Sequence, residues 1–255
     1  MNFIVSASTD IGTVKESNQD SLQVKVLTVN GEKLVFAVLC DGMGGLAKGE
    51  LASASVVKAF DRWAKERLPA LCAAGVAEGG IRTEWSRVFM EYNEKIKDYG
   101  KKSAIQLGTT AVVLLLYRGR YYIGNVGDSR VYEIVQNARV LTKDQTLVAR
   151  EVEQGQLTEA EAERDARRSV LLQCIGASDM VYPDFFSGEM KKDAVYMLCS
   201  DGFRHEVSAE EIYAYFSPER MVSAETMQER ERALIALNKQ RNERDNISVI
   251  TIRTF

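Results

Sequence analysis

Two aspartates, Asp20 and Asp41, lie at equal distances in the sequence from the dipeptide Asn30-Gly31. Asn-Gly between two apolar runs is typical of a two-residue β-hairpin loop, so the two aspartates should face each other across paired strands. Opposed carboxylates repel, and a hard divalent cation between them removes that repulsion. The spacing therefore predicts an oxygen-ligand site for Mg²⁺ or Mn²⁺.

Three further aspartates occupy similar places beside apolar runs. Asp128 and Asp201 each follow such a run, as Asp41 does, and Asp245 precedes one, as Asp20 does. If the two sets of strands run in opposite directions, all five side chains collect at one edge of a sheet. Any one of them alone is better explained as a turn former, because Asp is favoured at strand ends. Five together, with one pair in register, favour a metal cluster.

The 255-residue chain has a net charge of −3, with Lys and Arg dispersed among Asp and Glu. This pattern argues against nucleic acid as a partner. No apolar stretch approaches the ~20 residues that span a membrane, and the N-terminus lacks a secretion signal pattern. The four cysteines follow no paired spacing, and Cys40 and Cys199 lie inside apolar runs. We therefore expect a reduced, cytoplasmic protein.

The apolar pattern predicts strands and helices in separate groups. Residues 22–26 alternate between apolar and polar side chains, and 34–40 is apolar almost throughout. Helical spacing follows at 51–68, and Thr83 is a candidate cap for a helix that ends near Tyr99. The remaining predicted elements are hairpin strands at 110–116 and 121–126 around Arg118-Gly119, their extension as a meander at 131–135 and 139–141, a strand at 194–199, helices beginning at Ser208 and Ser223, and a last strand at 247–252.

This succession indicates an α+β fold, a central β-sandwich of two mainly antiparallel sheets flanked by α-helices. No linker or repeat divides the chain, so we expect a single domain over 1–255. Thr158 and Glu161 form a capping box that opens a polar helical segment. Because this segment has almost no apolar face, we expect a mobile excursion at about 145–170 rather than a part of the core.

Several catalytic motifs are excluded by individual residues. Residues 44–49 have the glycine spacing of a P-loop, but Glu50 stands where Lys is required. No cysteine has an arginine six positions later, and no Gly-x-Ser-x-Gly elbow surrounds Ser129. His205 is the only histidine, which excludes zinc sites built on several histidines. Hydrolysis by metal-bound water remains, with the Gly42 carbonyl as a candidate ligand and Lys15 as a candidate cation for phosphate.

Six short motifs occur in order: Lys15 to Asp20, Asp41 to Gly45, Gly108 to Thr110, Gly127 to Arg130, Ser200 to Gly202, and Asp245-Asn246. Each alone is weak, but their order and spacing resemble the metal-dependent protein phosphatase type 2C family in its compact bacterial form. The resemblance covers nearly the whole chain. It implies a centre of two Mn²⁺ or Mg²⁺ ions and hydrolysis of phosphoserine and phosphothreonine by a bridging water, without a phosphoenzyme.

The resemblance also implies a role for each aspartate. Asp41 would bridge the two ions. Asp20 and the Gly42 carbonyl would hold one ion, while Asp201 and Asp245 would hold the other. Asp128 resembles the family's ligand for a third, weaker ion. The polar segment after Gln154 corresponds to the family's flap, which lies beside the site and affects substrate choice.

Three residues depart from the family pattern. Lys15 stands where the family usually has a phosphate-binding Arg, and Lys cannot form the two-pronged contact, so we expect weaker phosphate binding. Met43 stands where some members have a His proposed as general acid, so the leaving group must be protonated by water. His205 stands where many members have an acidic residue near the third ion. It is either a ligand or a surface side chain, and a solitary His favours the surface.

Two functions are compatible with these residues. The first is a monomeric phosphatase that acts on proteins phosphorylated by a cognate Ser/Thr kinase and on the kinase itself, or, more narrowly, on an anti-sigma antagonist. The second is a catalytically silent domain of the same fold that binds a phosphoprotein or regulates a kinase. The complete aspartate set favours the enzyme, and only Lys15 favours the silent domain.

Overall fold

The computed structural model describes residues 1–44 and 48–255, and it contains two five-stranded sheets. The strand order in the first sheet is β1 (Phe3–Asp10), β12 (Ile247–Thr254), β11 (Val195–Cys199), β8 (Arg130–Ile134) and β9 (Ala138–Val140). In the second it is β10 (Asp184–Glu189), β7 (Arg120–Val126), β6 (Ala111–Tyr117), β3 (Glu32–Cys40) and β2 (Ser21–Val29). Every pairing in these sheets is antiparallel. A short ladder joins β4 (Gly42–Met43) to β5 (Gly108–Thr109).

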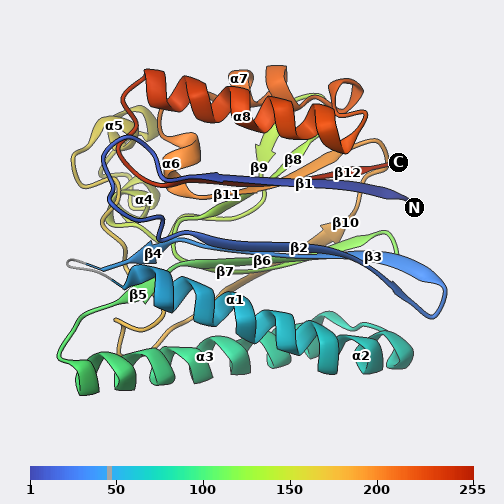
Figure 1. Cartoon of the computed structure of the whole chain (residues 1–255), viewed down its shortest axis with the longest axis horizontal. Coiled ribbons are helices and arrows are strands. Elements are labelled where there is room, and N and C mark those ends of the chain that lie inside the picture. Colours follow the sequence, from blue (N-terminus) through green and yellow to red (C-terminus); the bar gives the residue numbers. More distant parts are fainter. Residues whose placement is uncertain (45–47) are drawn as a thin grey trace.

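The two sheets stack face to face, and helices cover both outer faces (Figure 1). The lower pair in Figure 1 is α1 (Gly49–Glu66) and α3 (Glu78–Ser103), with α2 (Leu68–Ala74) between them in sequence. The upper layer holds α7 (Ala209–Phe216), the 3-10 helix η1 (Pro218–Arg220) and α8 (Ala224–Gln240). The predicted α+β sandwich is therefore confirmed.

Three apolar cores correspond to the three interfaces between these layers. The core between the sheets is built from inward-facing residues such as Leu39, Leu114 and Ile250. Phe36, Trp63 and Trp85 belong to the core under α1 and α3, and the third core lies under α7 and α8. Strand β3 contributes to two cores from alternate side chains, which explains why its sequence is apolar throughout.

Both predicted hairpin turns are confirmed. Asn30 and Gly31 have positive φ angles of 53° and 79°, and Val29 pairs with Glu32. Arg118 and Gly119 have φ angles of 48° and 71° between β6 and β7. Positive φ at both central residues is the geometry that matches the twist of the flanking strands.

Two predictions about the elements are wrong. The strands at 131–135 and 139–141 do not extend the β6–β7 hairpin as a meander, because β8 pairs with β11 in the other sheet. Thr83 is not the cap of α3, which begins at Glu78. Its hydroxyl instead donates a 2.9 Å hydrogen bond to the Gly79 carbonyl inside the helix.

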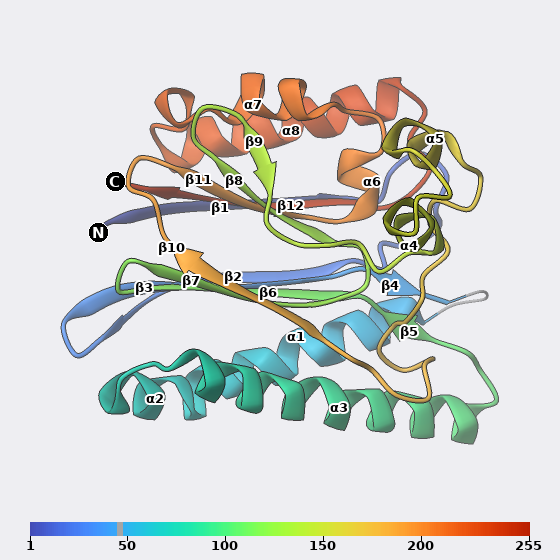
Figure 2. The ribbon, with the colours of Figure 1, turned by 180° about the vertical axis from the view of Figure 1, so that it is seen from behind.

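Three small helices gather with β4 and β5 at the end of the sandwich opposite the chain termini (Figure 2). They are α4 (Leu147–Glu153), α5 (Glu159–Arg164) and α6 (Asp201–Arg204). The capping box of Thr158 and Glu161 is present, and α5 has no buried residue, as its polar sequence predicts. All four cysteines are buried and free. In the described residues, no helix has both the length and the apolar character needed to cross a bilayer.

Candidate active site

The β2–β3 hairpin brings Asp20 and Asp41 to the end of the sandwich that carries α6. The strand ladder reaches the residues next to both aspartates. One step beyond them, the Gly42 N–H donates a 3.1 Å hydrogen bond to the Gln19 carbonyl. The two aspartates lie between these contacts, so they are opposed as the hairpin register predicts.

Thr110 fixes the backbone of Asp41. The Asp41 N–H donates to the Thr110 Oγ1 at 3.0 Å, and the Thr110 N–H donates to the Asp41 carbonyl at 2.8 Å. The Thr110 hydroxyl also shares a 2.9 Å hydrogen bond with the hydroxyl of Ser129, which follows Asp128. These contacts link the backbones that carry Asp41 and Asp128, and they account for the threonine and serine of the two motifs.

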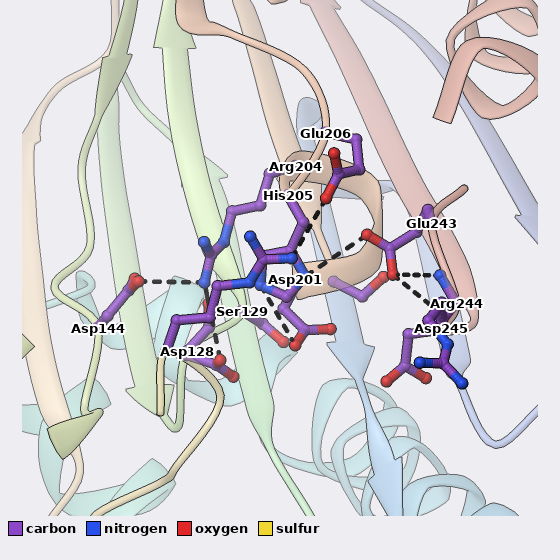
Figure 3. Close-up of polar contacts among 12 residues, drawn as sticks. Asp128, Ser129, Asp144, Asp201, Arg204, His205, Glu206, Glu243, Arg244 and Asp245 are labelled. Atoms are coloured by element: carbon purple, nitrogen blue, oxygen red, sulfur yellow. Dashed lines mark hydrogen bonds and ion pairs between the residues drawn. The ribbon is translucent and has the colours of Figure 1, made fainter. Parts of the chain in front are cut away.

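Asp201 and Asp245 come from neighbouring antiparallel strands. Asp201 follows β11 as the first residue of α6, and Asp245 precedes β12. The Ser200 N–H donates to the Ser248 carbonyl at 3.1 Å, and the Ser248 N–H donates to the Ser200 Oγ at 3.0 Å. Figure 3 shows both aspartates, with Asp128, at this end of the strands.

Burial and mutual repulsion disfavour the charged forms of these carboxylates. Burial, with the charges of Asp201 and Asp245 adding to it, raises the pKa of Asp20 to about 7. The pKa of Asp41 is raised well above its usual range by burial and then by the other four aspartates. Both carboxylate oxygens of Asp20 and the Oδ1 of Asp201 are buried without a hydrogen-bond partner. Buried polar atoms rarely stay unpaired, so these oxygens are candidate ligands of a cation.

The five aspartates lie near one another, but their side chains are not arranged as a complete metal site. Within 1–44 and 48–255, no three acidic, histidine or cysteine side chains are grouped closely enough to hold a metal ion as they stand. The backbone contacts above nevertheless place the five aspartates near one another, and each of the other four raises the pKa of Asp41. Side-chain rotation is then needed to bring their oxygens to a common ion. The donors are all oxygens, which suits Mg²⁺ and Mn²⁺.

Lys15 lies beside the same carboxylates. Its Nζ is 2.7 Å from the Asp245 Oδ1, and its side chain is 39% exposed. Burial opposes the charged form, but the hydrogen bond with Asp245 and the charges of Asp245, Asp41 and Asp201 raise the pKa of Lys15. The ammonium therefore lies beside the aspartates, next to Asp245.

Gly42 and Gly202 are required by close contacts within the chain. A Cβ on Gly42 would lie 2.4 Å from the carbonyl oxygens of both Gln19 and Gly49. A Cβ on Gly202 would lie 2.3 Å from the Asn246 carbonyl oxygen. Either methyl group would push apart segments that carry the aspartates.

The expectation of a surface position for His205 is wrong. Its side chain is only 8% exposed, and it lies between two carboxylates. The Nε2 is 3.6 Å from the Asp201 Oδ2, and the Nδ1 is 3.6 Å from the Glu243 Oε2 (Figure 3). The turn from β11 through α6 places the imidazole inside the site, next to a predicted ligand.

Sequence reasoning also missed Arg204 and Asp144. Arg204 donates through Nη2 to the Asp144 Oδ2 at 3.1 Å and to the Asp128 carbonyl at 3.2 Å. Asp144 in turn accepts two 2.8 Å hydrogen bonds from Arg130. Burial and the Asp201 charge raise the pKa of Asp128 to about 7, although Arg204 acts against this shift. The Gly127 to Arg130 motif contains Arg130, but nothing in the sequence pairs it with Asp144.

A sequence profile described as Protein phosphatase 2C matches residues 12–238, which is most of the chain. This chain belongs to the protein phosphatase 2C family. It is similar to the serine/threonine phosphatase stp of Listeria innocua, with 30% identity over 249 residues, covering 96% of this chain and 93% of the relative. It is also similar to protein phosphatase PhpP of Streptococcus pneumoniae, with 31% identity over 212 residues and 82% of each chain covered.

Solved structures of serine/threonine phosphatases share the whole fold. The serine/threonine phosphatase of S. agalactiae superposes with a TM-score of 0.86 at 27% identity, and all of both chains is covered. The catalytic domain of PstP, which was crystallised with two manganese ions, has a TM-score of 0.75 at 25% identity, with 99% of both chains covered. In this phosphatase 2C chain, Gly45 of the motif Asp41 to Gly45 lies outside the described residues. Residues 45–47 of the P-loop-like spacing at 44–49 lie outside them as well.

Proposed function

We propose that this protein is a metal-dependent protein phosphatase that hydrolyses phosphoserine and phosphothreonine. The observation that carries this proposal is the meeting of five aspartates from distant segments, with buried oxygens on Asp20 and Asp201 that have no hydrogen-bond partner. The phosphatases to which the chain is similar support the reaction class, and the two manganese ions of PstP support the metal dependence.

The proposed ligands are assigned by position. Asp41, in the middle of the cluster, would contact both of two Mn²⁺ or Mg²⁺ ions. Asp20 and the Gly42 carbonyl would hold one ion, and Asp201 and Asp245 the other. Two such metal ions would lower the pKa of a bound water and stabilise the charge of a transferring phosphoryl group.

The chain's own groups would bind and orient the phosphate ester. The Lys15 ammonium is a partly exposed cation next to the cluster, and its contact with Asp245 shows that it reaches the carboxylates. It would offset the negative charge of the phosphate as a point charge, without the paired contact that Arg makes. Met43 carries no proton to donate, so we assign protonation of the leaving group to water.

We further propose that the chain works as a monomeric, single-domain enzyme in the cytoplasm. Its substrates would be proteins phosphorylated by a cognate Ser/Thr kinase, and the kinase itself. The segment at about 145–170 would act as a flap that influences substrate choice. The exposed surface of α5 supports this role, because a helix without buried residues can change its contacts at little cost.

A catalytically silent phosphoprotein-binding domain is the second candidate, and Lys15 is the residue that favours it. The two candidates differ in turnover. The purified chain, treated with chelator and dialysed, should hydrolyse a phosphothreonine peptide only after Mn²⁺ or Mg²⁺ is added. Peptide binding without phosphate release at saturating metal would identify the silent domain. Release that persists in excess chelator would reject the metal mechanism.

A further inference from the structure

Arg204 is a buried cation at the edge of the aspartate cluster. Its side chain is 11% exposed, and those of Asp128 and Asp144 are 4% and 12% exposed. The Arg204 Nη2 lies 3.7 Å from the Asp128 Oδ2 and 3.1 Å from the Asp144 Oδ2. A buried guanidinium needs nearby anions to offset its lost hydration, and these two carboxylates are its ion-pair partners.

Two contacts hold the guanidinium in place. Its Nη2 donates to the carbonyl of Asp128 itself at 3.2 Å and to the side chain of Asp144. Asp144 is fixed in turn by the two hydrogen bonds from Arg130. The cluster of Arg130, Arg204, Asp128 and Asp144 thus joins two guanidinium groups to two carboxyl groups.

Two polar neighbours of Asp128 are already engaged by other side chains. Asp144 accepts hydrogen bonds from Arg130 and Arg204, and His205 lies between Asp201 and Glu243. A divalent ion at Asp128 would lie against the Arg204 guanidinium and be repelled by it.

We propose that Arg204 is a positioning residue that serves as the counter-cation of Asp128, so that the site holds two ions and excludes a third. This inference rests on the proposed function. It differs from the expectation that Asp128 is a metal ligand, because the positive charge beside this carboxylate is supplied by the chain.

Counting bound Mn²⁺ tests the inference without reference to activity. Equilibrium dialysis, with free Mn²⁺ followed by electron paramagnetic resonance, should give two ions per wild-type chain. Arg204→Gln should bind a third, weaker ion, and adding Asp128→Asn to it should remove that ion. Arg130→Gln is the matched control, since it loses one positive charge from the same cluster but leaves Arg204 beside Asp128, and it should still bind two. Circular dichroism checks that each variant is folded.

Other outcomes separate the failure of this inference from that of the proposed function. A third ion in the wild type, or two ions in folded Arg204→Gln, would overturn the role of Arg204 and leave the phosphatase proposal intact. No bound Mn²⁺ together with no phosphate release would overturn both. If Arg204→Gln does not fold, the single variant Asp128→Asn tests the inference. It should bind two Mn²⁺ ions with both affinities within about twofold of wild type. Loss of an ion would contradict the inference.

Discussion

The Asn246 Oδ1 accepts a 2.8 Å hydrogen bond from the Gln19 N–H, joining residues 227 positions apart in the chain. The Asn246 Nδ2 donates to the carbonyls of Ile11 at 2.9 Å and Ser17 at 3.1 Å. The buried side chain of Asn246 therefore holds the segment before Asp20 next to Asp245. This segment carries Lys15.

Asn246→Ala should be strongly destabilising. The change leaves the buried Gln19 N–H without a partner, which costs about 1–3 kcal/mol, and it removes the two partly buried hydrogen bonds to Ile11 and Ser17. We expect a loss of about 2–4 kcal/mol in the free energy of unfolding in urea, with weaker Mn²⁺ binding. Gln156→Ala is the control, because its side-chain amide donates to the exposed Gln154 side chain, away from the aspartates. Equal, small losses in both variants would contradict the fastening role.

The elements with strong local signals could be predicted from sequence. Both hairpins rest on turn residues at positive φ, and the helices at Ser208 and Ser223 begin at these caps. Strand β1 was missed because Ser6 and Ser8 interrupt its apolar pattern. Their hydroxyls bond to the buried carboxylate of Glu231, 2.8 and 2.7 Å away, which no local pattern reveals. Strand β10 was missed because it offers only two large apolar residues.

The same distinction holds for the site. The aspartates could be found because each borders an apolar strand, and the hairpin register sets one pair. The places of Arg204 and His205 depend on how α6 turns after β11, and their partners Asp144 and Glu243 come from separate loops. A pairing between distant loops has no periodicity, and His205 was expected at the surface because it is the only histidine in the sequence.

The metal-free protein should lose stability as the pH rises from about 5 to above 7. Asp20 and Asp128 have folded-state pKa values of about 7, whereas the ordinary pKa of an Asp side chain is 3.8. In this window the folded state binds protons that the unfolded state has released, so unfolding becomes easier with rising pH. We expect Tm at pH 5.5 to exceed Tm at pH 7.5 by at least about 3 °C.

The double variant Asp20→Asn/Asp128→Asn is the control for this pH effect, and its Tm should depend less on pH. Saturating Mn²⁺ should reverse the slope in the wild type, because the ions favour the ionised carboxylates. A wild-type metal-free Tm that increases towards pH 7.5 would show that these carboxyls are not the groups that control stability.

Asp41→Asn should separate activity from stability. Losing the carboxylate that would contact both ions should lower turnover by at least about a hundredfold. The metal-free variant should be as stable as the wild type or more so, because one buried charge among four like charges is removed. Phosphopeptide turnover and thermal unfolding measure the two effects. Near-normal turnover would mean that Asp41 is misassigned.

Gly202→Ala should unfold the site locally. Its Cβ would meet the Asn246 carbonyl oxygen at 2.3 Å, so β12 and α6 must separate. We expect a loss of about 2–3 kcal/mol in the free energy of unfolding. Gly79→Ala is the matched control, because its Cβ meets nothing within 4 Å on α3, and it should stabilise the protein by ~0.5 kcal/mol. Denaturant titration of both variants compares them, and a harmless Gly202→Ala would contradict the close contact.

Lys15→Arg should lower the KM for a phosphothreonine peptide or leave it unchanged. Arg adds the two-pronged contact with phosphate that Lys lacks, while its charge still faces Asp245. Lys15→Gln should raise KM with a smaller change in kcat, because the lost contact is made to bound substrate as well as to the transition state. Steady-state kinetics at saturating Mn²⁺ tests both, and equilibrium dialysis controls for altered metal content. A large increase of KM in Lys15→Arg at normal metal content would show that this side chain is not placed to contact phosphate.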